Sequence, residues 1–353
     1  MLNFRVVGVM SGTSLDGVDV TLCTFHLTNS GWEYEIELGK TYTYPPVLFD
    51  ELNQALELSA LDLAFLNNAL SEYWSACVLE LIGEEEVDFV SVHGQTIFHQ
   101  PNKGLTLQLV NASLMASRLK LPVVSDFRSS DVALGGQGAP LVPIGDVHLF
   151  KHFKACINLG GFCNISLIGE QSCLAFDVSV ANLLLNHLAS EKDLNYDHNG
   201  EIAKMGEVHE HILPRLNTLP FFSKVAPKSL GVEWLESRFI PLWEELTEGI
   251  SLEDRMSTAC AHIADQLSRS LNGIEGDVLV TGGGALNSFL MDQIKARLGS
   301  KVTIAKANQE LIEFKEALVF AFLAVLKWRG EVNVLSSVTG AKTDHSAGQI
   351  VYP

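Results

Sequence analysis

The residues that most directly suggest chemistry lie in one short run near the N-terminus, from Gly8 to Asp19. Its glycines let the backbone come close to a ligand, and Asp16 and Asp19 are oxygen donors suited to a hard cation such as Mg2+. The run also supplies three hydroxyl groups, those of Ser11, Thr13 and Ser14. Such a set suits a nucleotide phosphate, but an ordinary hairpin turn between the apolar runs 4–7 and 18–25 is the open alternative.

Two further glycine loops follow strand-like runs. The pair at 160–161 separates the runs 155–159 and 164–168, so the strand–glycine–strand pattern recurs and suggests two related halves. The triplet at 282–284 lies between a strand at 277–280 and a helix, where backbone amides and the helix N-terminus can face a nucleotide. It lacks the spacing of dinucleotide-binding and P-loop motifs, and a turn for tight helix–strand packing is its alternative.

Composition limits the class of protein and of partner. A chain of 353 residues exceeds the usual size of one core, so we expect two domains with a cleft between them. With 47% hydrophobic and 19% charged residues, the chain can fill two cores. The net charge of -18 argues against a nucleic-acid partner or an anionic membrane surface and favours a small ligand.

The six scattered cysteines show neither a Cys-x-x-Cys pair nor metal-ligand spacing, which predicts buried thiols. The chain enters a strand directly at Phe4, without the pattern of a signal peptide, and no apolar run approaches the length of a membrane span. These features predict a cytoplasmic protein.

Strands that alternate with helices predict an α/β fold. The expected strands are 4–7, 18–25, 34–43, 89–92, 105–110, 121–124, 155–159, 164–168 and 277–280, and the expected helices are 60–82, 178–190, 256–271, 288–298 and 318–328. Residues 122–143 look like an irregular loop because they combine glycines and prolines. We place the domain boundary there, with an N-terminal lobe of 1–125 plus about 330–353 and a C-terminal lobe of 126–329.

Three glycine loops of this kind are typical of the actin, hexokinase and Hsp70 ATPase superfamily. Within it, eight collinear stretches closely resemble the anhydro-N-acetylmuramic acid kinases. They are MSGTSLDGVD (10–19), HGQT (93–96), DFR (126–128), GGQGAPLVP (135–143), PKS (227–229), GGGALN (282–287), EALVFA (316–321) and VTGA (338–341). The resemblance implies a two-domain actin-like (ribonuclease H-like) α/β fold with an interdomain cleft.

The resemblance also implies a reaction. The family uses ATP and water to open the 1,6-anhydro ring of anhydro-N-acetylmuramic acid and to phosphorylate O6, which gives N-acetylmuramic acid 6-phosphate for peptidoglycan recycling. It implies ATP with Mg2+ at Asp16, and a homodimer. The residues expected to bind the nucleotide are Gly12, Thr13, Ser14, Leu15, Asp16, Gly17, Val18, Asp19, Gly160, Gly161, Gly282, Gly283, Gly284 and Asn287.

For the general base, Asp177 occupies the position of the family's catalytic aspartate, although an N-cap of the following helix is the alternative. The residues expected to bind the substrate are His93, Gln95, Thr96, Arg128, Asp131 and Glu316. Arg128 suits a grip on the lactyl carboxylate of the sugar, and Asp131 would fix Arg128 or a hydroxyl. Three alternatives remain open. Arg128 and Asp131 could form a surface ion pair, His93 could have a structural role, and Glu316 could interact with the helix dipole from a first helical turn.

The chain departs from the family after Asp177. Most members read Phe-Asp-Thr-Gly-Pro-Gly-Asn, whereas residues 178–181 here are Val-Ser-Val-Ala before Asn182. Losing two glycines stiffens this loop and affects which sugar is accepted. A plain sugar kinase without ring hydrolysis and a non-catalytic nucleotide or sugar sensor are therefore the other functions considered. The loop with Lys228 and Ser229 is a candidate ligand-proximal segment without an assigned role.

Overall fold

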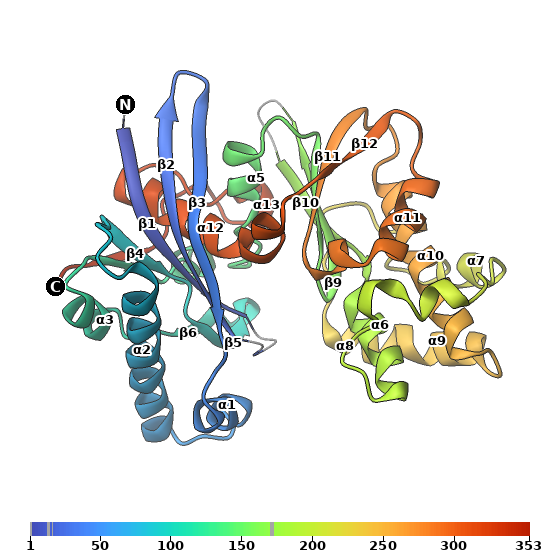
Figure 1. Cartoon of the computed structure of the whole chain (residues 1–353), viewed down its shortest axis with the longest axis horizontal. Coiled ribbons are helices and arrows are strands. Elements are labelled where there is room, and N and C mark those ends of the chain that lie inside the picture. The colour runs from blue at the N-terminus through green and yellow to red at the C-terminus, as the bar shows by residue number, and fades with distance from the viewer. Residues whose placement is uncertain (1, 13–14, 16, 170–172) are drawn as a thin grey trace. The chain divides into compact units, whose positions relative to one another are not determined.

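The structure is a computed structural model that describes residues 2–12, 15, 17–169 and 173–353. By its contacts the chain forms two compact units (Figure 1). Unit 1 comprises Met1–Phe150 and Phe314–Pro353, and unit 2 comprises Lys151–Glu313. Residues 126–150 and 314–329, which the sequence analysis assigns to the C-terminal lobe, thus belong by their contacts to unit 1.

Unit 1 contains a six-stranded sheet with the order β13-β7-β4-β1-β2-β3 and a separate β5-β6 pair. Its strands are β1 (Leu2–Ser11), β2 (Val18–Thr28), β3 (Gly31–Tyr42), β4 (Phe89–Val92), β5 (Gln95–Gln100), β6 (Leu105–Leu109), β7 (Val123–Ser125) and β13 (Gln349–Val351). Its helices are α1 (Pro46–Asn53), α2 (Ala60–Ile82), α3 (Ala112–Leu119), α4 (Ser129–Ala133), α5 (Pro143–Leu149) and α13 (Ser336–Thr339), together with most of α12 (Gln309–Trp328).

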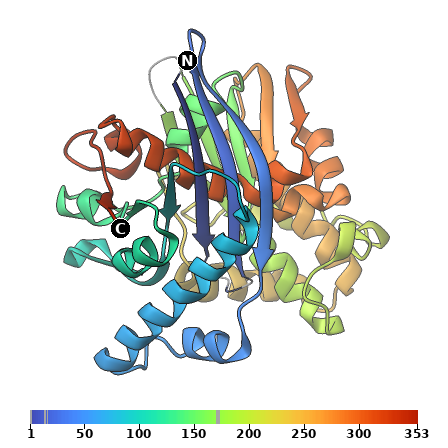
Figure 2. The ribbon, with the colours of Figure 1, turned by 60° about the vertical axis from the view of Figure 1, so that its left-hand side comes forward.

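The strands of unit 1 bury both faces of the sheet, as their period of two requires. Val7 and Val9 of β1 belong to the core that α2 completes with Leu70 and Trp74. The intervening residue, Gly8, faces α12 instead. Figure 2 shows α2, in light blue, on the near side of the blue strands and α12, in red-orange, on the far side.

Helix α12 packs directly on the backbone of the sheet. A Cβ at Gly8 would lie 2.3 Å from the carbonyl oxygen of Ala317, so only glycine permits this contact. Ser91 of β4 donates a hydrogen bond of 2.6 Å to the carbonyl of Phe320 on the same helix. Because both contacts involve backbone atoms of α12, they fix the distance between this helix and strands β1 and β4.

Unit 2 contains a five-stranded sheet with the order β10-β9-β8-β11-β12. Its strands are β8 (Ala155–Leu159), β9 (Phe162–Ile168), β10 (Cys173–Val180), β11 (Gly276–Thr281) and β12 (Val302–Lys306). Its helices are α6 (Asn182–Ala189), α7 (Ile212–Leu216), α8 (Val232–Trp234), α9 (Ile240–Thr247), α10 (Leu252–Ser270) and α11 (Ser288–Arg297). The amphipathic helix α10 buries Met256, Cys260 and Ile263 in the core of the unit.

The two units repeat one topology. In each, the first three strands are antiparallel neighbours, and the fourth and fifth strands add in parallel beside the first, which gives the order third-second-first-fourth-fifth. The hairpin pattern in the sequence had suggested this duplication. The arrangement confirms the expected actin-like α/β fold.

Three local expectations are wrong. Strand β10 continues past Asp177 to Val180, because the β-branched residues there favour a strand, and Ala181 precedes α6. The predicted helix from 178 and the N-cap role of Asp177 are therefore excluded. Residues 122–143 are only partly a loop, since β7, α4 and the start of α5 lie within them.

The third error concerns Glu316. Helix α12 begins at Gln309, where Asn308 accepts a hydrogen bond of 2.9 Å from the amide of Leu311. Glu316 therefore lies about two turns inside the helix rather than in its first turn, and the helix-dipole role is excluded.

All six cysteines are described, all are buried, and none forms a disulfide, as the sequence predicted. Among the helices of the described residues, none combines the length and the apolar composition that a membrane span needs.

Candidate active site

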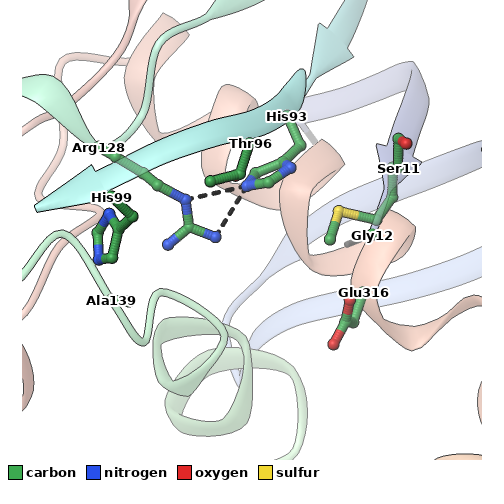
Figure 3. Close-up of a pocket in the computed structure, with 9 residues that line it drawn as sticks. Ser11, Gly12, His93, Thr96, His99, Arg128, Ala139 and Glu316 are labelled. Carbon is green, nitrogen blue, oxygen red and sulfur yellow. Dashed lines mark hydrogen bonds between the residues drawn. The ribbon is translucent and has the colours of Figure 1, made fainter. Parts of the chain in front are cut away.

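A pocket of about 360 Å³ lies in unit 1 at the carboxyl ends of the parallel neighbours β1, β4 and β7 (Figure 3). Its lining residues are Met10, Ser11, Gly12, His93, Thr96, His99, Arg128, Ala139 and Glu316. Side chains that follow parallel strands meet at this edge of an α/β sheet, where ligands usually bind. The topology therefore brings together residues that are more than 100 positions apart in the chain.

Arg128 and His93 form the fixed centre of this pocket. The Nε and Nη2 groups of Arg128 donate to Nε2 of His93 at 3.0 and 2.8 Å, and Nη1 donates to the carbonyl of Gly138 at 2.6 Å. Since guanidinium only donates, Nε2 of His93 accepts and the ring proton belongs on Nδ1. Figure 3 shows both bonds to His93, with Glu316 placed apart from them on α12.

The charges in the pocket follow from burial. Burial, together with the positive charge of Arg128, lowers the pKa of His93 to about 3, so the imidazole is neutral at physiological pH. Burial also lowers the pKa of Arg128 to about 10, and the negative charges of Glu316 and Asp131 oppose this effect. Arg128 remains a cation, which gives the pocket a positive centre suited to an anionic group.

Asp131 lies behind the pocket rather than in it. Its side chain is fully buried, and its carboxylate accepts hydrogen bonds of 2.6 Å from the amide of Gly138 and from the hydroxyl of Thr339. The burial of Asp131 excludes a surface ion pair with Arg128, and its carboxylate is bonded to protein groups. Asp131 holds the loop that supplies Ala139 to the pocket and the carbonyl of Gly138 to Arg128.

Gln95 is also placed behind the pocket. It is 2% exposed and accepts a hydrogen bond from Ser11, whose hydroxyl also lies 2.6 Å from that of Tyr44. Trp74 of α2 donates to the same Tyr44 hydroxyl at 3.3 Å. This chain of hydrogen bonds ties the end of β1, where the first glycine loop starts, to the long helix α2.

His99 lines the pocket although sequence reasoning missed it. In regular alternation His99 would lie on the opposite face of β5 from Thr96. A register shift between Thr96 and Phe98 removes this difference, because Thr96 pairs with Gln108 and His99 pairs with Thr106, two residues away. No signal in the sequence marks this register shift.

The first glycine loop is described in part. Gly12 lines the pocket, Leu15 adopts a positive φ of 56°, and Gly17 has a φ of 147°. Val18 and Asp19 begin β2, and Asp19 accepts a hydrogen bond of 2.6 Å from Thr41. The predicted nucleotide ligands Thr13, Ser14 and Asp16 lie outside the described residues, and so does the predicted metal position at Asp16.

In unit 2, the second and third glycine loops lie next to each other at the carboxyl ends of β8 and β11, which are parallel. A Cβ at Gly282 would lie 2.4 Å from Oδ1 of Asn158, and a Cβ at Gly284 would lie 2.7 Å from Cβ of Leu159. The backbone of 282–284 therefore packs against the hairpin of Gly160 and Gly161. The sheet thus brings together two of the loops that the sequence predicts to bind the nucleotide.

The start of α6 and of α11 stabilises these loops. The amide of Asn182 donates to the carbonyl of Gly160 at 3.1 Å, and its side chain donates to the carbonyl of Leu159 at 2.9 Å. Asn287 caps α11 by accepting a hydrogen bond of 2.9 Å from the amide of Leu290.

Asp177 belongs to the same sheet and lies in register with two asparagine residues. It pairs with Asn164 of β9, which pairs with Asn158 of β8, so the three side chains share one face. Asp177 is half-buried, and burial raises the pKa of its carboxyl, although a hydrogen bond of 2.7 Å from the amide of Leu230 opposes this effect. A carboxylate with a raised pKa next to phosphate loops is suited to take a proton.

Among the described residues, no group of three or more His, Cys, Asp and Glu side chains could hold a metal ion. His262 is 1% exposed and packs against the rings of Phe222 and Phe239.

Comparison with known proteins identifies the family. The family profile described as Anhydro-N-acetylmuramic acid kinase matches residues 4–353. The chain belongs to this family. The anhydro-N-acetylmuramic acid kinase of Haemophilus influenzae is 33% identical over 383 residues, covering 99% of both chains, and that of Ralstonia nicotianae is 34% identical over 380 residues, covering 99% of this chain and 97% of the relative.

Among solved structures, a ROK family glucokinase from Streptomyces griseus in complex with glucose and AMPPNP matches with a TM-score of 0.42 and 13% identity, covering 90% of this chain and 98% of that chain. As a member of the anhydro-N-acetylmuramic acid kinase family, the chain belongs to a family of kinases. Its departure from the family motif after Asp177 corresponds to the end of β10.

Proposed function

We propose that the protein is an ATP-dependent kinase that opens the ring of 1,6-anhydro-N-acetylmuramic acid with water and phosphorylates O6, in peptidoglycan recycling. The observation that carries this proposal is the half-buried carboxylate of Asp177, beside two glycine loops of one sheet, in a member of this kinase family. Family membership supplies the substrate, and the site supplies a base and phosphate-binding loops.

In the proposed reaction, Asp177 takes a proton from a water molecule whose oxygen attacks the anomeric carbon C1 of the sugar. The bond between C1 and O6 breaks, and O6 then attacks the γ-phosphorus of ATP while ADP leaves. Backbone amides of the glycine loops, among them those of Gly160, Gly161 and Gly283, would stabilise the transferring phosphoryl group.

The unit 1 pocket is proposed to bind the sugar. Arg128 carries a planar cation that three hydrogen bonds hold in place, which suits a bidentate bond to the lactyl carboxylate. His93, Thr96, His99 and Glu316 surround it with polar groups for hydroxyls and the acetamido group. Asp131 and Gln95 would act by holding the residues that line the pocket.

Mg2+ completes the proposal. It usually binds through one or two carboxylates and the phosphates of the substrate. Asp16 and Asp19 are the proposed carboxylates; when bound, the ion would neutralise charge on the phosphates. We also propose a homodimer in the cytoplasm, which light scattering and cell fractionation would test.

The deciding experiment uses 18O-labelled water and mass spectrometry. Incubation of the protein with ATP and anhydro-N-acetylmuramic acid should give a phosphorylated product with the label at the anomeric position. The Asp177→Asn variant should lower kcat at least 100-fold, because removal of a general base costs roughly 10²–10⁴-fold.

A phosphorylated product without label would instead indicate a simple sugar kinase. Binding of ATP without any turnover of a panel of anhydrosugars and free amino sugars would indicate a sensor. Either result would refute the proposed reaction.

A further inference from the structure

β10 is an edge strand of the unit 2 sheet, and residues 228–230 cover its outer side at Asp177. The amide of Asp177 donates to the carbonyl of Lys228 at 2.9 Å. Two residues later, the amide of Leu230 donates to Oδ2 of Asp177 at 2.7 Å. One short segment therefore holds both the main chain and the carboxylate of Asp177.

Lys228 anchors this segment to a buried aromatic cluster. Its ammonium donates to the carbonyl of Phe221 at 3.2 Å and lies 4.5 Å from the centre of the Phe221 ring. Phe221 is 2% exposed and packs against the rings of Phe222 and Trp234, 5.5 and 5.3 Å away. The anchor is rigid because the cluster is part of the packed interior.

We propose that Lys228 is a positioning residue for the general base: it holds residues 228–230 so that the Leu230 amide fixes Oδ2 of Asp177 and leaves Oδ1 for the water. This inference rests on the proposed function, because it assumes that Asp177 is the base. It assigns to Lys228 a structural anchor in place of the direct phosphate contact that a lysine in a ligand-proximal loop would suggest.

The contacts of Lys228 favour this assignment. Its ammonium is half-buried and already contacts the carbonyl and the ring of Phe221, and burial together with the nearby charge of Lys224 lowers its pKa. These contacts direct the ammonium toward Phe221, whereas a lysine that binds a phosphate directs its point charge at the ligand. The anchor also has an electrostatic consequence, because the Leu230 amide stabilises the ionised form of Asp177 against burial.

Cys163, the other titratable group that interacts with Asp177, carries no charge that could shift the pKa of Asp177. Cys163 lies on the adjacent strand β9, and burial raises the pKa of its thiol far above physiological pH, so it stays neutral. A displacement of the 228–230 segment should therefore change the pKa of Asp177 through the Leu230 amide. Loss of that hydrogen bond raises the pKa of Asp177.

The test compares Lys228→Met, Lys228→Arg and the control Lys224→Met in the full-length protein. Lys224 carries the same charge four positions earlier, and its side chain is exposed. We expect Lys228→Met to lower kcat about tenfold, the order of one charge-assisted hydrogen bond, and to move the acid limb of the kcat profile to higher pH. The KM for ATP should stay within about twofold, Lys228→Arg should recover most of kcat, and Lys224→Met should match the wild type.

Several outcomes would overturn the inference. An unmoved acid limb in a folded Lys228→Met protein would do so, and so would a KM for ATP raised tenfold or more, which would mark a direct phosphate contact. If Lys228→Met does not fold by circular dichroism, a Lys228→Arg protein with wild-type kcat and acid limb supports the anchor, and one with a raised KM for ATP refutes it. An active Asp177→Asn variant would refute the proposed function itself and this inference with it.

Discussion

The role of Arg128 can be tested by replacing it with lysine, which keeps the charge and removes the planar fork. Three hydrogen bonds to His93 and Gly138 use three of the five N–H groups of Arg128, which leaves two for a carboxylate. Lysine offers a single point charge and would lose one of the two charge-assisted bonds, worth about 1.5–3 kcal/mol. This loss corresponds to a decrease of about 10- to 150-fold in kcat/KM.

The assay compares two sugars that differ only in the lactyl group. For 1,6-anhydro-N-acetylmuramic acid, Arg128→Lys should lower kcat/KM by this factor, measured by release of ADP. For 1,6-anhydro-N-acetylglucosamine, which lacks the carboxylate, kcat/KM or the Kd from calorimetry should change less than about threefold. Arg118→Lys serves as the control, because Arg118 forms an exposed ion pair with Glu72. Equal losses for both sugars would show that Arg128 does not recognise the carboxylate.

Three further predictions concern stability and are measured by urea unfolding. Gly8→Ala should destabilise by about 1–3 kcal/mol or more, because its Cβ would meet the backbone of Ala317 at 2.3 Å, whereas Gly299→Ala, with open space around it, should cost almost nothing. Thr339→Val should cost about 1.5–3 kcal/mol, because it removes a hydrogen bond to the buried Asp131 carboxylate, and the exposed Thr343→Val is its control; equal midpoints for the two would contradict this role. Asp177→Asn should stabilise the protein at pH 7. Because the pKa of Asp177 is raised in the folded state, the stability of the wild type falls as pH rises from about 3.9 through that folded-state pKa. The gain in the variant should therefore vanish below about pH 3.9. An equal gain in stability at pH 7 and below about pH 3.9 would rule out ionisation of Asp177 as its cause.

The sequence predicts elements best where one pattern is strong and uninterrupted. The helix at Ala60–Ile82 and the strand at Phe89–Val92 have the predicted bounds, because each is set by apolar periodicity and local flanking signals. The duplicated order of strands also follows from the repeated hairpin pattern. The sequence does not indicate which of the predicted residues line the site and which are buried behind it, as the burial of Gln95 and Asp131 shows.

The errors at Asp177 and Glu316 have one physical source. Both arose from placing a helix start by the first strongly apolar run, whereas tertiary packing and a cap decide where a helix begins. At Asp177 the strand continues because Ser179 and Val180 stay paired with β9 past a register shift, and the apolar run obscured the strand propensity of the β-branched residues there. At Glu316 the cap at Asn308 was a readable signal that the apolar run obscured. His99 was missed because a bulge reverses alternation, which only coordinates reveal.

The insertion of unit 2 into unit 1 has a consequence for synthesis on the ribosome. Strands β1 to β7 of unit 1 are made early, but the part of α12 that covers the second face of their sheet, from Phe314 onwards, is translated only after unit 2. At about 5–20 residues per second, the roughly 160 intervening residues take about 8–30 s. During that time Phe25 and Phe89 lack the cover of Phe322 and Trp328, and an apolar face of the nascent chain stays exposed to water.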